Sequence, residues 1–148
     1  MDSARSDRCT IRVESAPYDT ITHATREALN RSMTERGWIN ASRPDSPAYD
    51  SALLVATELV VNACRHADGP EEVRLIWEGT DLTIEVDDTA PGRPCPRAVA
   101  ERGETGGFGM AIIADLSEDW GVRVAPEGRG KTVYARLACR EGRATVAA

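Results

Sequence analysis

Residues 49–67 have the sequence YDSALLVATELVVNACRHA, which predicts one long and mostly buried helix. Leu54, Glu58, Asn62 and His66 are spaced four residues apart, so they lie along one side of that helix. The rest of the circumference is mainly apolar, with Leu53, Val55, Leu59, Val60, Val61 and Cys64. Burying a carboxylate and a carboxamide in such surroundings is unfavourable without polar partners. We therefore expect a polar group from elsewhere in the chain, or a ligand, to meet this line of side chains.

The composition is that of a single globular domain, with 148 residues of which 41% are hydrophobic and 28% charged. The apolar runs are much shorter than the roughly 20 residues that span a bilayer, so no membrane association is expected. The N-terminal stretch lacks the apolar segment of a signal peptide, which favours a cytoplasmic protein. The net charge of −6, without a cluster of basic residues, argues against direct nucleic-acid binding. Four widely spaced cysteines predict neither a zinc site nor a disulfide framework.

Two further helices are expected beside the central one. Apolar spacing predicts a helix over residues 18–36 that stops at Gly37, and another over residues 108–116. The segment 38–50 reads as a loop, and either Ser46 or Asp50 could cap the central helix, which should run to about residue 67.

Alternating apolar and polar residues predict about five strands. They are expected at residues 10–14, 71–77, 82–86, 120–124 and 132–137, with the last four forming two β-hairpins. Residues 1–9 and 140–148 are predicted to be flexible ends of one domain over 10–139. The fold class is therefore α+β: a two-layer sandwich with a mixed, mostly antiparallel sheet and three helices on one face.

The central helix carries the first candidate site. Asn62 offers an amide oxygen that can bind a hard cation such as Mg²⁺, and Glu58, one turn earlier, could orient or deprotonate a nucleophile nearby. The alternative is that both side chains only hydrogen-bond neighbouring backbone.

A strand that ends in two carboxylates, Asp87 and Asp88, is the second candidate. A carboxylate there can accept a hydrogen bond from an exocyclic amine such as that of adenine. If Ile84 and Val86 face the core, alternation places Asp88 at the site and Asp87 in solvent. The alternative is an ordinary turn rich in aspartate.

The third candidate is the glycine-rich stretch 103–110, GETGGFGM, which leads into a helix. Glycines let the backbone approach a phosphate closely, and a helix N-terminus presents free N–H groups to it. The stretch is not a P-loop, because no G-K-[ST] follows, and a long loop in place of a tight strand turn disfavours a Rossmann motif.

In this order and spacing, the three segments resemble the N box, G1 box and G2 box of the GHKL ATPase superfamily, which has the Bergerat ATP-binding fold. The likeness is closer to its small single-domain branch, the anti-sigma-factor serine kinases of the RsbW type. It rests on residues 58–67 (ELVVNACRHA), 88–92 (DTAPG), 107–110 (GFGM), 119–122 (DWGV) and 130–133 (GKTV). Ala90 departs from the family pattern, because it replaces the first glycine after the aspartate.

The resemblance implies a role for each matching residue. Asn62 would be the Mg²⁺ ligand, Glu58 the general base and Asp88 the acceptor of the adenine amine. Thr132 would support the adenine contact, and Arg65 and His66 could touch phosphate, although a packed histidine at the helix end is an equal alternative. The expected nucleotide contacts are completed by Gly92, Gly106, Gly107, Phe108, Gly109 and Met110, next to a flexible lid over residues 89–107.

The resemblance also implies a function. Such a kinase binds ATP (or ADP) with Mg²⁺, holds a sigma factor inactive and phosphorylates a serine on a STAS-domain anti-anti-sigma partner. It also implies a homodimer formed through the N-terminal strand and first helix. Two alternatives stay open: a non-catalytic, ATP-dependent binding module that works by partner switching, and the catalytic domain of a sensor histidine kinase. The latter is disfavoured because no phosphoacceptor helix pair is recognised in the sequence.

Overall fold

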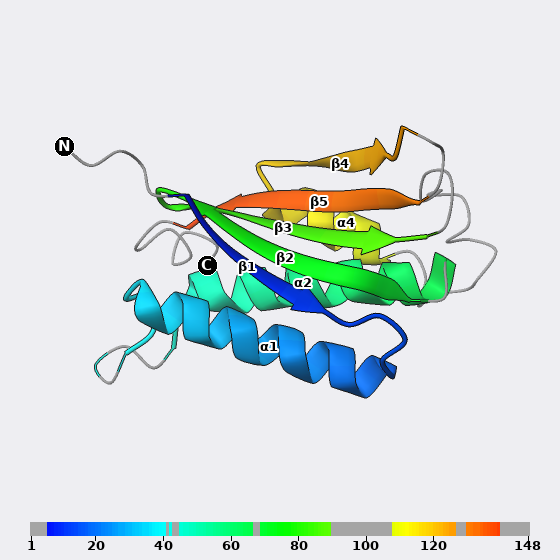
Figure 1. Ribbon diagram of the computed structural model, residues 1–148. Coiled ribbons are helices and arrows are strands. Elements are labelled where there is room, and N and C mark those ends of the chain that lie inside the picture. The colour runs from blue at the N-terminus through cyan, green and yellow to red at the C-terminus, as the bar shows by residue number, and fades with distance from the viewer. Residues whose placement is uncertain are drawn as a thin grey trace.

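The computed structural model describes residues 6–40, 42, 45–66, 69–89, 108–126 and 130–139. Figure 1 shows the elements, which follow in the order β1 (Ser6–Arg12), α1 (Tyr18–Glu35), α2 (Pro47–His66), β2 (Pro70–Glu78), β3 (Asp81–Asp88), α4 (Phe108–Leu116), β4 (Asp119–Val124) and β5 (Lys131–Ala138). Within the described residues, three helices and one five-stranded sheet confirm the predicted α+β fold.

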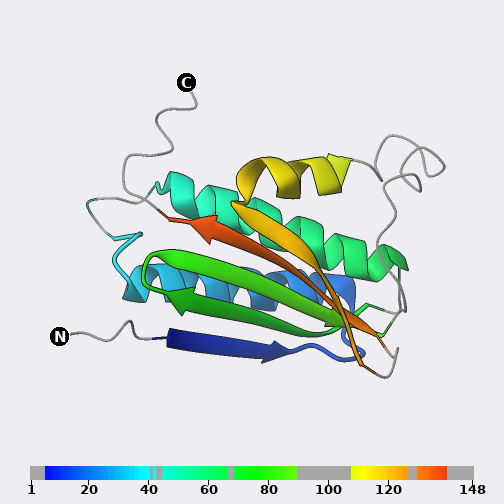
Figure 2. The same ribbon diagram turned by 90° about the horizontal axis from the view of Figure 1, so that it is seen from above.

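The strands form one open sheet in the order β1-β2-β3-β5-β4, with β3 at its centre. Each pairing between these strands is antiparallel. The three helices cover the same face of the sheet, and α4 lies beside α2 (Figure 2). We call the helix-covered face the inner face and the opposite one the outer face. This arrangement is the two-layer sandwich that the sequence predicts.

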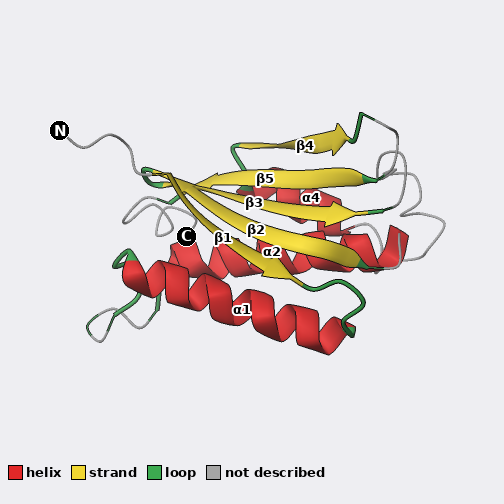
Figure 3. Cartoon of the chain, viewed as in Figure 1, coloured by secondary structure: helices red, strands yellow, loops and turns green. Residues whose placement is uncertain are grey.

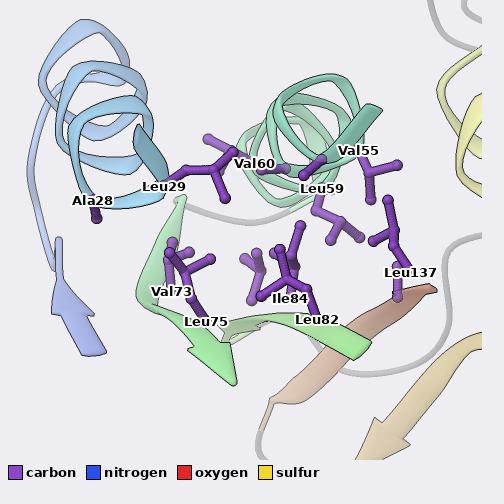
Figure 4. Close-up of a cluster of buried hydrophobic side chains, with 14 of the residues drawn as sticks. Ala28, Leu29, Val55, Leu59, Val60, Val73, Leu75, Leu82, Ile84 and Leu137 are labelled. Carbon is purple, nitrogen blue, oxygen red and sulfur yellow. The ribbon is translucent and has the colours of Figure 1, made fainter. Parts of the chain in front are cut away.

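The core lies between the inner face and the helices α1 and α2 (Figure 4). Leu29 of α1 and Leu59 of α2 point toward Leu75, Ile84 and Leu137 of the sheet, and all five are buried. Burial of this kind is the main stabilising contribution, about 1.5–3 kcal/mol for each large apolar side chain. It fixes which face of each strand points inward.

The first strand begins earlier than predicted. β1 covers Ser6–Arg12 rather than residues 10–14, so residues 6–9, predicted to be part of a flexible end, belong to the sheet. The reason is tertiary: β1 pairs with almost the whole of β2, from Ser6 opposite Glu78 to Arg12 opposite Glu72. Cross-strand pairing outweighs the polar character of these residues. The predicted tail 140–148 lies outside the described residues.

The helix ends agree with the local signals in the sequence. Gly37 has a φ of +82°, the left-handed conformation that often follows a helix. Ser46 is the cap of α2, because its Oγ accepts a hydrogen bond from the Tyr49 N–H over 3.2 Å. Asp50, the other cap candidate, lies in the first turn.

The predicted functional segments come together at one end of the molecule. Helix α2 and strand β3 end there, and α4 and β5 begin there (Figures 1 and 3). We call this the site end. Element ends up to 65 residues apart in sequence, from His66 to Lys131, thus share one end of the fold, because antiparallel strands and helices alternate in direction.

None of the described helices has the length and hydropathy needed to cross a membrane. Cys9, Cys64 and Cys139 are free thiols.

Candidate functional site

Asp88 and Lys131 meet on the inner face at the site end. Ile84, Val86 and Asp88 all point inward and are buried, as strand alternation predicts. Lys131 is the direct partner of Asp88 in the β3–β5 register, and its Nζ donates to Asp88 Oδ1 over 3.0 Å. The lysine and aspartate side chains are only 3% and 1% exposed. Asp88 is therefore not part of an exposed turn but one member of a buried ion pair.

Two polar side chains of α2, Glu58 and Asn62, are half-buried. Glu58 and Asn62 lie one turn apart in the half of the helix that leads to the site end, and Arg65 is exposed near its last turn. Within the described residues, neither Glu58 nor Asn62 forms a side-chain hydrogen bond. The alternative that both side chains only bond neighbouring backbone therefore does not describe this part of the structure. His66 is the last residue of α2, and its side chain lies outside the description.

Glu58 has a perturbed acidity. Burial raises its pKa above the ordinary value of 4.5, and the nearby positive charge of Arg65 partly opposes that effect. A carboxylate with a raised pKa is better matched to accept and return a proton near neutral pH. Perturbed groups of this kind are frequent at functional sites.

The glycine-rich segment is described only from its helix onward. Phe108 and Gly109 are the first two residues of α4, and Met110 is half-buried against the core. The helix therefore begins at the residue that the sequence predicts. The expected contacts at Gly92, Gly106 and Gly107 lie outside the described residues.

A comparison with protein families identifies the fold. The family model described as the histidine kinase-like ATPase domain matches residues 20–137, which is most of the chain. The chain belongs to this family. A search of curated proteins found no match to it. The match covers nearly all of α1 and β5 and the whole of α2, β2, β3, α4 and β4, so it includes each of the three candidate segments. Membership of this family implies that the domain binds a nucleotide.

Asn62 and Asp88 have oxygen atoms of the kinds that a nucleotide with bound Mg²⁺ would require. Among the described residues, no group of three or more His, Cys, Asp or Glu side chains could hold a metal ion by itself. Mg²⁺ is commonly bound by one or two protein oxygens together with substrate phosphates and water. Asn62, with one amide oxygen, suits that mode, and the buried carboxylate of Asp88 suits an amine of the base.

The structure corrects the prediction for Asp87. It does not lie free in solvent on the outer face, because its two carboxylate oxygens each accept a hydrogen bond of 2.7 Å from the Arg74 guanidinium. Thr132 also donates to Asp87 Oδ1, over 2.5 Å. Burial alone would raise the pKa of Asp87, but the hydrogen bonds from Arg74 and Thr132 hold it below its ordinary value.

Thr132 lies on the outer face, and its adenine role stays a prediction. The resemblance implied that its hydroxyl supports adenine, but Thr132 pairs with Asp87 and its hydroxyl is engaged on the outer face. Asp88, to which the resemblance assigns the adenine amine, is on the inner face. The β5 residue that faces the site is therefore Lys131, one position earlier, because successive strand residues point to opposite faces.

The outer-face network extends across four strands. Arg74 of β2 also donates to Glu72 over 2.5 Å and to Glu85 of β3 over 2.8 Å. Arg123 of β4 donates to the second oxygen of Glu85. Burial would raise the pKa of Glu85, but the hydrogen bonds from Arg123 and Arg74 outweigh it and keep the pKa low. We call these side chains, with Asp87 and Thr132, the outer network.

Sequence reasoning missed two residues at the site end. Lys131 could have been found by extending the inward alternation of Val133 and Leu137 back by one more step. Gly130 has a φ of +86°, and a Cβ atom there would lie 2.4 Å from the backbone oxygen of Asp88. That close approach requires glycine. The sequence analysis named Gly130 only as part of the GKTV stretch that carries the resemblance, without a structural role.

Proposed function

We propose that this ATPase domain is a regulatory protein serine kinase of the RsbW type. It binds Mg-ATP, holds a sigma factor inactive and phosphorylates a serine on a STAS-domain anti-anti-sigma protein. The observation that carries this proposal is the pair Glu58 and Asn62, one turn apart on α2 and leading toward the end of β3 where Asp88 is buried. A domain that only bound nucleotide would have no use for a half-buried carboxylate of raised pKa at that place.

The chain's residues divide the work of phosphoryl transfer. Asp88 fixes the base and thereby sets the direction of the phosphate chain, while Asn62 offers its amide oxygen to the metal. Bound Mg-ATP would supply the phosphoryl group, and its Mg²⁺ would neutralise the negative charge of the phosphates. Glu58 accepts the proton of the serine hydroxyl as that oxygen forms its bond to the γ-phosphorus and ADP leaves. Positioning and charge neutralisation provide most of the catalysis in this reaction class.

Nucleotide binding is the first test. Titration calorimetry of the purified chain with Mg-ATP should give saturable binding, and Asp88→Asn should weaken it at least a hundredfold while the circular dichroism spectrum stays unchanged. Asp87→Asn is the matched control, since it alters the neighbouring carboxylate on the outer face and should retain wild-type affinity. Equal weakening by both substitutions, or by neither, would remove Asp88 from the base contact.

Phosphoryl transfer is the second test. The chain is incubated with γ-labelled ATP and a panel of STAS-domain proteins from the host organism, and label on a serine is expected for one of them. Glu58→Ala should keep Mg-ATP affinity within about threefold and lose transfer by roughly 10²-fold or more, the usual contribution of a general base. If ATP binds and no STAS-domain protein is labelled, the chain acts as a nucleotide-dependent binding module instead.

A further inference from the structure

Lys131 is unusual for the surface on which it lies. The other inner-face residues of β5 are Val133, Ala135 and Leu137, and all are buried and apolar. Lysine is among the residues least often fully buried, and it is found inside a protein almost only with a partner. At the site end, however, the last inward position of β3 and the first of β5 carry a charged pair.

Stability alone does not account for this pair. Exchanging a buried ion pair for apolar residues of similar volume is often neutral or even stabilising. The preceding rung of the same two strands, Val86 opposite Val133, shows that this face accepts an apolar pair. The charged pair is thus expected to serve something that meets it at the site end.

The pair presents an acceptor and a donor side by side. A carboxylate has about four acceptor positions and an ammonium has three N–H donors, so neither group is limited to the bond that joins them. The Watson–Crick edge of adenine has the matching order: the 6-amino group donates, and the adjacent ring nitrogen N1 accepts. Asp88 and Lys131 together therefore match two neighbouring atoms of the base.

We propose that Lys131 is a base-contacting residue that determines specificity, with its Nζ donating a hydrogen bond to N1 of adenine while Asp88 accepts one from the 6-amino group. This inference rests on the proposed nucleotide site and adds a second contact to it. A ligand without an acceptor at N1 forms one hydrogen bond fewer with the buried ammonium, and losing a hydrogen bond to a buried charge weakens binding strongly.

The test compares ATP with two analogues in which one ring nitrogen is replaced by carbon. Calorimetry of the wild-type chain should show 1-deaza-ATP binding at least tenfold more weakly than ATP. The expected loss corresponds to one hydrogen bond to a charged group. The control, 7-deaza-ATP, lacks a nitrogen on the other ring and should bind within about threefold of ATP. Equal affinity for ATP and 1-deaza-ATP overturns the proposal.

The substitution Lys131→Met removes the donors and keeps the length of the side chain. In this variant, ATP and 1-deaza-ATP should bind with about equal affinity. If the lysine were merely structural, its loss would weaken the binding of both ligands equally and leave the ratio of their affinities unchanged. A retained tenfold preference assigns the N1 contact to another residue and overturns the proposal.

A measurement on the wild type keeps the proposal testable if Lys131→Met does not fold. The ¹⁵N resonance of N1 in labelled ATP should move upfield on binding, as it does when that nitrogen accepts a hydrogen bond. An N1 resonance that stays at its free position in bound ATP overturns the inference, while the proposed nucleotide site stands. If the wild type binds no ATP at all, the proposed function itself fails first.

Discussion

Asp87 and Asp88 are adjacent residues of the same strand, yet they point to opposite faces of the sheet. Asp87 belongs to a hydrogen-bonded network and Asp88 to a buried ion pair. Asp87 points to the outer face, where Arg74 and Thr132 occupy both of its oxygens. Asp88 points to the inner face, where it is almost completely buried against Lys131. The outer face holds a network that joins four strands, and the inner face holds a pair at the end where the predicted functional segments converge.

The difference teaches how to separate a structural carboxylate from a functional one. The outer network ties β2, β3, β4 and β5 together through many short hydrogen bonds, so its removal should cost stability. The inner pair occupies positions where apolar residues would serve the fold equally well. Four substitutions test this division, beginning with the largest expected effect.

Arg74→Met should give the largest loss of stability. It leaves Glu85 and Asp87 with one fewer cationic partner, and removing one member of a buried charged group costs about 3 kcal/mol of unfolding free energy. Urea denaturation measures this loss, and Mg-ATP affinity of the folded variant should stay within about twofold. Arg12→Met, an exposed arginine on β1, is the control and should change stability by less than about 0.5 kcal/mol.

Gly130→Ala should come next, because it disturbs the inner face through the backbone. An alanine there would be strained at a φ of +86° and would collide with the backbone oxygen of Asp88. We expect a loss of about 2 kcal/mol or more, together with weaker ATP binding. Gly79→Ala is the matched control: its φ is +63° but nothing lies within 4 Å, so it should show strain alone, about 1 kcal/mol, with unchanged ATP affinity.

Most of the fold could be predicted from the sequence, because hydrophobic periodicity and end signals determine it. The helix at Phe108–Leu116 has its predicted bounds, and the inward side of β3 follows from alternation. The early start of β1 could not be predicted, since residues 6–9 pair with β2 residues that lie 66 to 72 positions away in sequence. Ser46 and Asp50 were indistinguishable as caps until the position of the first turn was known.

The site was less predictable, for a physical reason. Asp88 followed from alternation, but the partners of Asp87 come from other strands and depend on register. The tight turn at Gly79 and Thr80 places Arg74 opposite Glu85, and that register could have been counted from the hairpin. Thr132 was assigned by resemblance, without applying to β5 the alternation that was applied to β3. That alternation indicates Lys131.

Thr132→Val is a milder test of the outer face. It removes one hydroxyl from Asp87 and keeps the shape of the side chain, so stability should fall by about 1 kcal/mol. Mg-ATP affinity, measured by calorimetry, should not change. A tenfold loss of affinity without loss of stability would instead return Thr132 to the adenine role that the resemblance implied.

Glu58→Gln should have the smallest effect on stability, and its sign depends on pH. Because burial raises the folded-state pKa of Glu58 above 4.5, its stabilising contribution is complete below pH 4.5 and is lost as pH rises through the folded-state pKa. The glutamine variant should therefore be more stable than wild type at pH 7.5. The two proteins should converge near pH 4.

Thermal unfolding of the wild type and the variant at pH 4 and pH 7.5 measures this dependence. If Glu58→Gln were less stable than wild type at pH 7.5, the fold would stabilise the ionised carboxylate. That result would contradict the expectation that burial of the ionised Glu58 lowers the stability of the fold.

The alternation that separates Asp87 from Asp88 also limits how this sequence can change in length. Inserting one residue within β3 ahead of the two aspartates would exchange their faces, taking Asp88 away from Lys131 and turning Asp87 into the core. Inserting two residues would preserve the faces. Over evolutionary time, viable descendants of this chain should therefore gain or lose residues in its connecting segments, or in pairs, and seldom singly within β3.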